Sequence, residues 1–344
     1  MSSRAAARDL AAREPRERGF APHSGDTTRM NDLASIIIPV YNRAAMLREA
    51  VASALAQTHR PIEILIVDDG STDDTPQVAA QLATQHAEIR VFTQANAGPG
   101  AARETARQAM RGRFVQLLDS DDLIDPRKLE LQIAALGANP DCGVATCKAR
   151  LVHEDGSVDP KPSRRTGERI GTMFPAMLQS RFWETAAPLY RASLMREPGA
   201  WLPLRAEEDW EYDCRIAAKG VRICYVDEWL CSHRRHGANI SGNFNRATMR
   251  DRATAHAAIF RHARDAGIGE DVPEMQHFAR ELFLLARQCG SLGLPDEASM
   301  LFDLARDASG PRRDALQFRL YAALTKIAGW QAAGKLSAAL DRLR

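Results

Sequence analysis

Four short apolar runs, each followed by a segment with helical spacing, restrict the fold more than any other feature of the chain. The first run, Ala34–Val40, is rich in isoleucine, as expected for a strand buried on both faces. Further strands are expected at 62–67, 89–93 and 114–118, with helices at 44–57, from 75 onward, at 100–110 and at 127–136. This alternation predicts an α/β fold with an open, doubly wound, mostly parallel sheet.

Acidic residues follow two of these predicted strands directly. Asp68 and Asp69 end the second strand, and Asp119-Ser120-Asp121-Asp122 ends the fourth. Ligands of open parallel sheets bind at the carboxyl ends of the strands, so both clusters belong to a candidate site. Carboxylate oxygens at 119 and 121 suit Mg²⁺ or Mn²⁺. The alternative is that these acidic residues only cap the following helices.

Composition excludes several classes of protein. The chain has 344 residues, a formal net charge of only +2 and few aromatic residues, which argues against a nucleic-acid-binding protein. It contains no long apolar run of the kind that spans a bilayer. Its six cysteines form no CxxC pair, so we expect buried thiols and a reducing, cytoplasmic location.

The chain divides into three predicted regions. Residues 1–30 are rich in Arg, Ala, Ser and Pro and are expected to be disordered, with Met30 as an alternative start. Residues 31–245 form the α/β domain. Residues 246–344 are expected to be helical throughout, with helices near 246–266, 273–289, 295–308 and from 313 to the end.

Taken together, four motifs resemble those of a known enzyme family. They are Ile38-Pro39-Val40-Tyr41-Asn42, Val67-Asp68-Asp69-Gly70-Ser71-Thr72-Asp73, Asn96-Ala97-Gly98 with Ala102-Arg103, and Leu117-Leu118-Asp119-Ser120-Asp121-Asp122. In this order and spacing they resemble a family 2 inverting glycosyltransferase of the GT-A fold, over residues 33–240. The resemblance implies transfer of a sugar from a nucleotide diphosphate donor, with UDP favoured, assisted by Mn²⁺ or Mg²⁺.

The resemblance also implies residues that bind the donor. Pro39, Tyr41 and Asp69 would line the nucleoside pocket, with Tyr41 stacked on the base or simply packed at the strand end. Arg103 would lie near the base or the diphosphate. Members of the family usually carry Asn after this Arg, whereas this chain has Glu104.

The implied metal site uses the last acidic cluster and a segment after it. Asp121 would bind the ion directly, and Asp119 would hold the ribose or a metal-bound water. His236 is the implied third ligand, with a structural histidine as the alternative. Arg234 or Arg235 would neutralise the diphosphate.

The implied catalytic base lies in Ala206-Glu207-Glu208-Asp209-Trp210. Asp209 would deprotonate the acceptor hydroxyl, and Glu208 would orient the acceptor. An acidic first turn that favours the helix dipole is the alternative. Neighbouring carboxylates are expected to raise the pKa of the base. Trp201 would form an apolar wall for a sugar or pack in the core.

The acceptor is left open among a polysaccharide, a lipid-linked oligosaccharide and a protein. A sugar nucleotidylyltransferase is disfavoured because no Gly-rich loop follows the first strand, and an inert scaffold is disfavoured by the full acidic set. The tail from Leu316 mixes apolar residues with Arg and Lys. We expect it to pack on the domain or a second subunit, with attachment to the inner face of the plasma membrane as the alternative.

Overall fold

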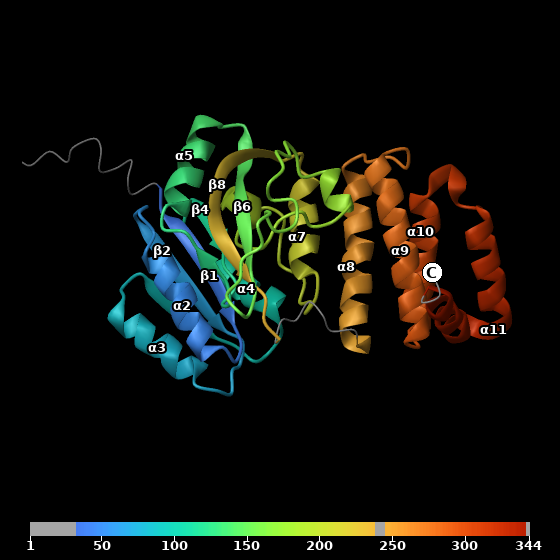
Figure 1. Ribbon diagram of the computed structural model, residues 1–344, viewed down its shortest axis with the longest axis horizontal. Coiled ribbons are helices and arrows are strands. Elements are labelled where there is room, and N and C mark those ends of the chain that lie inside the picture. Colours follow the sequence, from blue (N-terminus) through green and yellow to red (C-terminus); the bar gives the residue numbers. More distant parts are fainter. Residues whose placement is uncertain (1–31, 238–244, 342–344) are drawn as a thin grey trace, which may run out of the picture.

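The computed structural model describes residues 32–237 and 245–341. The predicted amino-terminal segment 1–30 lies outside these ranges, and so do residues 238–241, the end of the segment 233–241 that is expected to close over the diphosphate. Figure 1 shows two halves side by side, a sheet covered by helices and a stack of helices formed by the carboxyl-terminal part of the chain.

The first half is built on one eight-stranded sheet with the order β3-β2-β1-β4-β7-β6-β8-β5. Its first four strands are β1 (Ala34–Val40), β2 (Ile62–Asp68), β3 (Ile89–Thr93) and β4 (Phe114–Leu117). They pair in parallel, with β1 between β2 and β4. Every residue of β1 and β2 is buried, which accounts for their nearly continuous apolar sequences. The predicted doubly wound arrangement is confirmed here.

Helices connect these parallel strands. They are α2 (Ala44–Leu55), α3 (Thr75–Gln85) and α4 (Pro99–Ala109), and α5 (Lys128–Ala138) follows between β5 and β6. Helix α4 lies against β1 and β2, α3 against β2 and β3, and α5 against β6 and β8. Pro99 occupies the first turn of α4, where a missing N–H leaves no helical hydrogen bond unmade.

The second part of the sheet was only partly expected. The apolar run near 143–151 predicts a strand and forms β6 (Cys142–Val152), whereas the sequence did not predict β5 (Leu123–Ile124), β7 (Leu189–Arg191) or β8 (Arg222–Arg234). Strand β7 pairs antiparallel with β4 and β6, and β8 runs parallel to β6. The carboxyl end of β8 therefore lies at the same edge as the ends of β1, β2 and β4.

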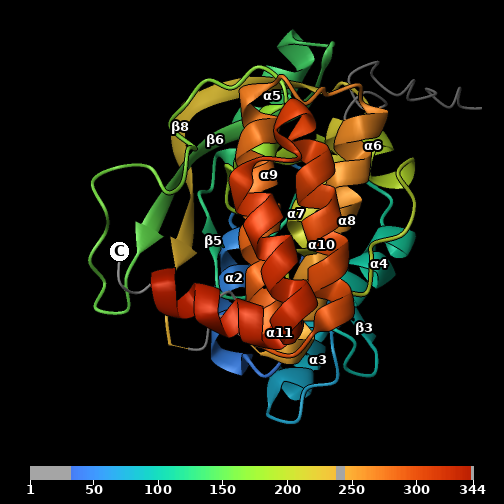
Figure 2. The same ribbon diagram turned by 90° about the vertical axis from the view of Figure 1, so that its right-hand side faces the viewer.

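The helical half consists of α8 (Arg246–Asp265), α9 (Pro273–Ser291), α10 (Pro295–Ala308) and α11 (Leu316–Asp341). Asn245 caps α8 by accepting from the N–H groups of Ala247 and Thr248. Helices α9, α10 and α11 enclose an aromatic cluster that includes Phe283, Phe302 and Phe318. Figure 2 shows α11 on the outer side of this stack.

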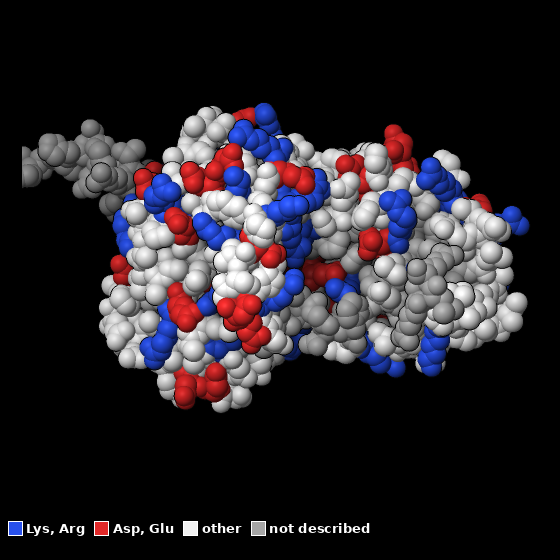
Figure 3. Space-filling model, in the orientation of Figure 1, with Lys and Arg blue, Asp and Glu red and all other residues white. Residues whose placement is uncertain are grey.

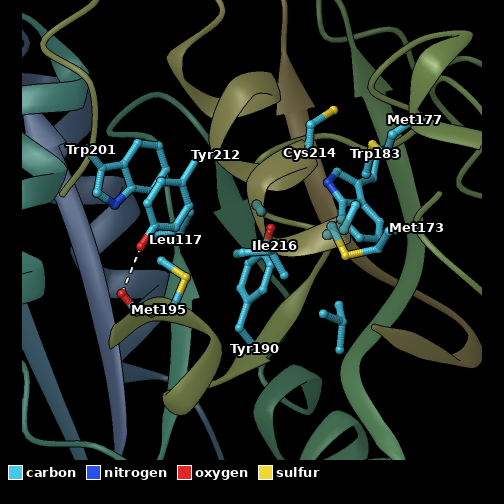
Figure 4. Close-up of a cluster of buried hydrophobic side chains, with 14 of the residues drawn as sticks. Leu117, Met173, Met177, Trp183, Tyr190, Met195, Trp201, Tyr212, Cys214 and Ile216 are labelled. Atoms are coloured by element: carbon cyan, nitrogen blue, oxygen red, sulfur yellow. Dashed lines mark hydrogen bonds between the residues drawn. The ribbon is translucent and has the colours of Figure 1, made fainter. Parts of the chain in front are cut away.

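Helix α7 (Glu208–Ala217) lies between the sheet and α8. The ring of Tyr212 stacks on Trp201 at 3.9 Å, and its hydroxyl donates to the carbonyl of Met195 over 2.7 Å (Figure 4). Trp201 is thus a core residue, and the interpretation of an apolar wall for a sugar is wrong because its ring is covered. All six cysteines are buried and unpaired, as predicted. Within 32–237 and 245–341, none of the helices is long and apolar enough to cross a bilayer.

Candidate active site

The carboxyl ends of β1, β2, β4 and β8 bring the predicted site residues to one edge of the sheet. Pro39 is buried within β1 opposite Val67, and Tyr41 follows the strand with 45% of its surface exposed. Asn42 next to it takes a positive φ of 51° and accepts from Thr72 N, which ties the loop after β1 to the loop after β2. An exposed ring is available to stack on a planar ligand.

Asp69 is buried and organises the loop that precedes α4. Its Oδ1 accepts from Gln94 Nε2 over 2.8 Å and from Ala97 N over 2.9 Å, and its Oδ2 accepts from Gly98 N over 2.8 Å. Gly98 has φ +92°, and a Cβ there would lie 2.9 Å from Arg205 Cγ, so the loop needs glycine. A carboxylate offers about four acceptor positions, which leaves Asp69 one for a ligand N–H.

The cluster after β4 has the geometry of a cation site. One carboxylate oxygen from each of Asp119, Asp121 and Asp122 lies within 4.8 Å of the others. Asp121 Oδ2 also lies 3.0 Å from His236 Nε2, so the structure brings the two predicted ligands together. This hard, oxygen-rich set with one imidazole fits Mg²⁺ or Mn²⁺. A guanidinium nitrogen of Arg43 contacts both Asp121 and His236 and offsets part of the negative charge of the cluster.

Asp122, the buried member of this cluster, pairs with the partly buried His233, for which sequence reasoning predicted no role. The Nδ1 of His233 lies 3.2 Å from each oxygen of Asp122. Burial opposes protonation of His233, but the hydrogen bond and charge of Asp122 outweigh it and raise its pKa to about 9. Asp122 also accepts from Arg234 N over 2.9 Å. These bonds anchor the end of β8 to the acidic loop.

The two arginines predicted to neutralise the diphosphate differ in their exposure to solvent. Arg234 is partly buried and its Nε donates to the carbonyl of Asp121, while Arg235 is exposed. The Arg235 backbone N–H donates to Val152 O over 2.8 Å. Arg234 therefore contacts the acidic loop directly, and Arg235 presents its side chain to solvent.

Arg103 joins the two acidic motifs. Its Nη2 lies 2.7 Å from Asp119 Oδ1, and its Nη1 pairs with Glu208 Oε1. The guanidinium also stacks over the ring of Trp201 at 5.3 Å. Glu104 stands where the family usually has Asn. It pairs with Arg107 at 2.7 Å and accepts a hydrogen bond from the backbone N–H of Trp201, so it helps to fix Trp201 beside Arg103. Arg103 is buried, so it is a structural part of the site and not a solvent-exposed charge on the surface of α4.

The pKa of the proposed base differs from the expectation. Burial alone would raise the pKa of Asp209, but the guanidinium groups of Arg181 and Arg103 outweigh it and hold the pKa below its usual range. Glu208 shows the opposite behaviour, because burial and the charge of Asp209 raise its pKa to about 7. The predicted rise of the base's pKa is therefore wrong for Asp209, and the reason is Arg181, which sequence reasoning missed.

Arg181 itself is held by a buried polar cluster. Its Nε lies 2.8 Å from Asp213 Oδ2, which also accepts from Trp183 Nε1 over 2.8 Å. The other oxygen of Asp213 accepts from the hydroxyl of Tyr190 over 2.6 Å. The cluster fixes the guanidinium that contacts Asp209.

The acidic motif is also tied to the helical half. Glu207 has a positive φ of 61° and lies 3.0 Å from Arg252 and 2.9 Å from His256, both on α8. Glu211 on α7 pairs with His262 of α8 at 2.8 Å. Figure 3 shows acidic side chains in the hollow between the two halves, with basic side chains beside them.

The fold and the arrangement of carboxylates in the site agree with the class of enzyme that the motifs predict. A mixed sheet with carboxylates at the ends of its parallel strands is the architecture of GT-A glycosyltransferases. The model of the family described as "Glycosyl transferase family 2" matches residues 35–197. An uncharacterized glycosyltransferase of a Nostoc species is 32% identical over 232 residues, 65% of this chain and 71% of that protein. The chain belongs to glycosyltransferase family 2.

Other comparisons agree with the fold. An uncharacterized glycosyltransferase of Rickettsia felis is 36% identical over 146 residues, 42% of this chain, and the chain spans only 24% of that protein's length. The crystal structure of Staphylococcus aureus TarS 1–349 in complex with UDP-GlcNAc matches with a TM-score of 0.65 at 19% identity, over 90% of this chain and 92% of that chain. A mannosyltransferase from Pyrobaculum calidifontis in complex with GDP-Man and Mn²⁺ matches with a TM-score of 0.53 at 20% identity, over 90% and 86%.

Proposed function

We propose that this chain transfers a sugar from a nucleotide diphosphate donor, a UDP-sugar in first place, to an acceptor hydroxyl with inversion at the anomeric carbon. The observation that carries the proposal is the bridge by Arg103, which connects Asp119 of the acidic loop with Glu208 beside Asp209. It makes one continuous site of motifs that lie far apart in the chain. UDP is supported by the similar TarS structure, which contains UDP-GlcNAc.

The donor would lie along the strand ends. Tyr41 offers an exposed ring for the base, and Asp69 keeps one acceptor position for a ring N–H. Arg234 and the more exposed Arg235 would face the diphosphate, since Arg234 ends β8 beside the acidic loop and Arg235 follows it. These roles place the sugar between the acidic loop and the start of α7.

A divalent cation is part of the proposal. Asp121 and His236 would hold it, with Asp119 beside them, and Arg43 would have to leave Asp121 when the ion binds. When bound, the cation supplies Lewis-acid stabilisation for the charge on the departing diphosphate. The similar mannosyltransferase structure contains Mn²⁺, which supports this choice.

Asp209 would take the acceptor proton. Arg181 keeps it ionised, so it is ready to accept a hydrogen bond from the attacking hydroxyl over the whole neutral range. Glu208, with a pKa near 7, would hold the acceptor by donating or accepting a hydrogen bond. The hydroxyl oxygen then bonds to the anomeric carbon as the bond to the diphosphate oxygen breaks on the opposite face.

The test is a donor screen with two variants. Hydrolysis and transfer are measured for a panel of UDP-, GDP- and TDP-sugars with Mn²⁺, and donor binding is measured by calorimetry. Asp121→Ala should lose metal-dependent donor binding, whereas Asp209→Asn should keep it and lose about 10²- to 10⁴-fold in turnover. Asp265→Asn, an exposed carboxylate on α8, is the control. Metal-independent binding, or full turnover by Asp209→Asn, would refute the assignment.

A further inference from the structure

Helix α11 is apolar on two opposite faces. Its inner face contributes Phe318 and Tyr321, which are 3% and 5% exposed and pack in the aromatic cluster with α9 and α10. Its outer face carries Leu316, Leu320 and Ile327, which are 68%, 61% and 86% exposed. A soluble helix normally has charged or polar side chains on its outer face. This face therefore needs a covering surface.

Exposed large apolar side chains are concentrated on this helix. Leu336 and Leu340 continue the exposed set beyond the break at Gly329, where φ is +77°. Among the described residues, the remaining exposed large apolar side chains are Tyr41, Val158 and Met300. Residues 316, 320 and 327 recur at helical spacing and form one stripe on the first part of α11. We call this stripe of Leu316, Leu320 and Ile327 the α11 stripe.

The charges beside the α11 stripe are of one sign, and the acidic residue of the helix, Asp341, lies at its end. Arg319 and Lys326 are exposed and flank the α11 stripe on one side, by their positions in the helical repeat, and Lys335 follows after the break. No Asp or Glu occurs between Ala315 and Leu340. Two copies of the chain that met through this stripe would bring their cations together, with no acidic residue of α11 beside the stripe to pair with them. An anionic surface would satisfy both the apolar and the basic side chains.

We propose that α11 docks on an anionic phospholipid bilayer, with the α11 stripe inserted at the boundary of headgroups and acyl chains. Arg319 and Lys326 then lie at the level of the lipid phosphates, as in other basic amphipathic helices that lie in the interface. Helix α11 is on the outer side of the helical stack, with its inner face already packed, so docking needs no unfolding (Figure 2). This inference is independent of the proposed sugar transfer.

The test is vesicle flotation of the full chain. The wild type should float with vesicles of phosphatidylcholine and phosphatidylglycerol, and should stay in solution with phosphatidylcholine alone or at high salt. Leu320→Gln with Ile327→Gln should weaken partitioning by about tenfold or more, because two apolar side chains lose their burial. Arg319→Gln with Lys326→Gln should weaken it by about fivefold per cation.

Controls keep the outcome unambiguous. Val158→Gln replaces a side chain that is 50% exposed elsewhere on the molecule and should float like the wild type. Circular dichroism and thermal unfolding establish that each variant is folded. Equal flotation of the wild type and both double variants would overturn the proposal. So would a wild-type dimer, detected by light scattering without lipid and dissociated by Leu320→Gln with Ile327→Gln.

Discussion

Arg181 Nη1 lies 2.6 Å from Asp209 Oδ2, so the candidate base, which is partly buried, forms an ion pair with a buried guanidinium. The same guanidinium holds Asp213 through its Nε, which prevents it from swinging away. Such a pair keeps the carboxylate ionised and fixed in direction. It also weakens the carboxylate as a base, so the attacking hydroxyl must be activated mainly by its position.

Removal of Arg181 should shift the pH profile of the reaction. Arg181→Met takes away the charge that lowers the pKa of Asp209, so burial and Glu208 then raise that pKa. Because the base must be ionised, the acid limb of kcat/KM against pH should move up by about one unit or more. Arg181→Lys should restore part of the shift. Arg165→Met, which breaks a pair with the exposed Glu168, should leave the profile unchanged, and an unmoved limb in Arg181→Met would contradict the assignment.

Loss of Arg103 should destabilise the fold. Arg103→Met leaves Asp119 and Glu208 without their shared cation, and breaking a buried pair costs about 3–5 kcal/mol. The double variant with Glu208→Gln should be less destabilised than the sum of the single variants. Arg113→Met, which removes an exposed pair with Asp32, should cost about 0–1 kcal/mol. Denaturant unfolding measures the free energy of unfolding of the two single variants, the double variant and Arg113→Met. If the effects of Arg103→Met and Glu208→Gln simply added in the double variant, the bridge by Arg103 would be contradicted.

Glu208 should make the fold less stable as the pH rises. Its folded pKa is about 7, against 4.5 for an unperturbed Glu. Below the lower value both states hold the proton. Between the two pKa values only the unfolded chain has lost the Glu208 proton, so the free energy of unfolding falls as the pH rises. Above the higher pKa both states are deprotonated and the free energy of unfolding falls no further.

Glu208→Gln should remove the fall in the free energy of unfolding that Glu208 causes as the pH rises. The variant should gain stability relative to the wild type by on the order of 2–3 kcal/mol between about pH 5 and about pH 8. Chemical denaturation at both pH values measures the gain. Glu197→Gln, on an exposed side chain, should show no such change, and a constant difference between Glu208→Gln and the wild type would contradict the shifted pKa.

Arg43 should compete with a metal ion. Its guanidinium contacts Asp121 and His236, the two residues proposed to hold the cation. Arg43→Ala should therefore bind Mn²⁺ more tightly in the absence of donor, seen as a loss of the free-ion signal in electron paramagnetic resonance. Arg48→Ala, which removes an exposed contact to Gln81, should bind like the wild type. Unchanged or weaker Mn²⁺ binding by Arg43→Ala would contradict the competition.

The sequence predicted the parallel part of the sheet well because each strand there is a short, local apolar run. The strand at Ala34–Val40 and the strand at Ile89–Thr93 have the predicted limits. Strand β8 was missed because Asp227 and Glu228 interrupt its apolar pattern. They lie at an irregularity where the partner of Cys147 is Val226 and that of Lys148 is Trp229. That pairing depends on a distant strand.

The sequence predicted the acidic motifs of the candidate site, but it did not predict the residues that hold those motifs in place. Asp121 and His236 were expected together and lie in contact. Arg181 lies in an irregular segment with no motif, and its role follows only from the fold, which brings it to Asp209. His233 is one position from predicted residues, but its partner Asp122 is on another strand's loop. The available signal was local, because His233 lies next to the predicted Arg234 and Asp122 ends the predicted acidic motif.

Glu207 connects the carboxyl-terminal helices to the proposed acceptor region. It adopts a left-handed backbone conformation immediately before the residues proposed to handle the acceptor, and its carboxylate pairs with Arg252 of α8 at 3.0 Å. A tail grafted from another member of the family would have to bring a matching cation to this carboxylate in place of Arg252. The helical extension is therefore not an exchangeable cassette, and chimaeras of such enzymes should be joined outside the Glu207–His256 interval.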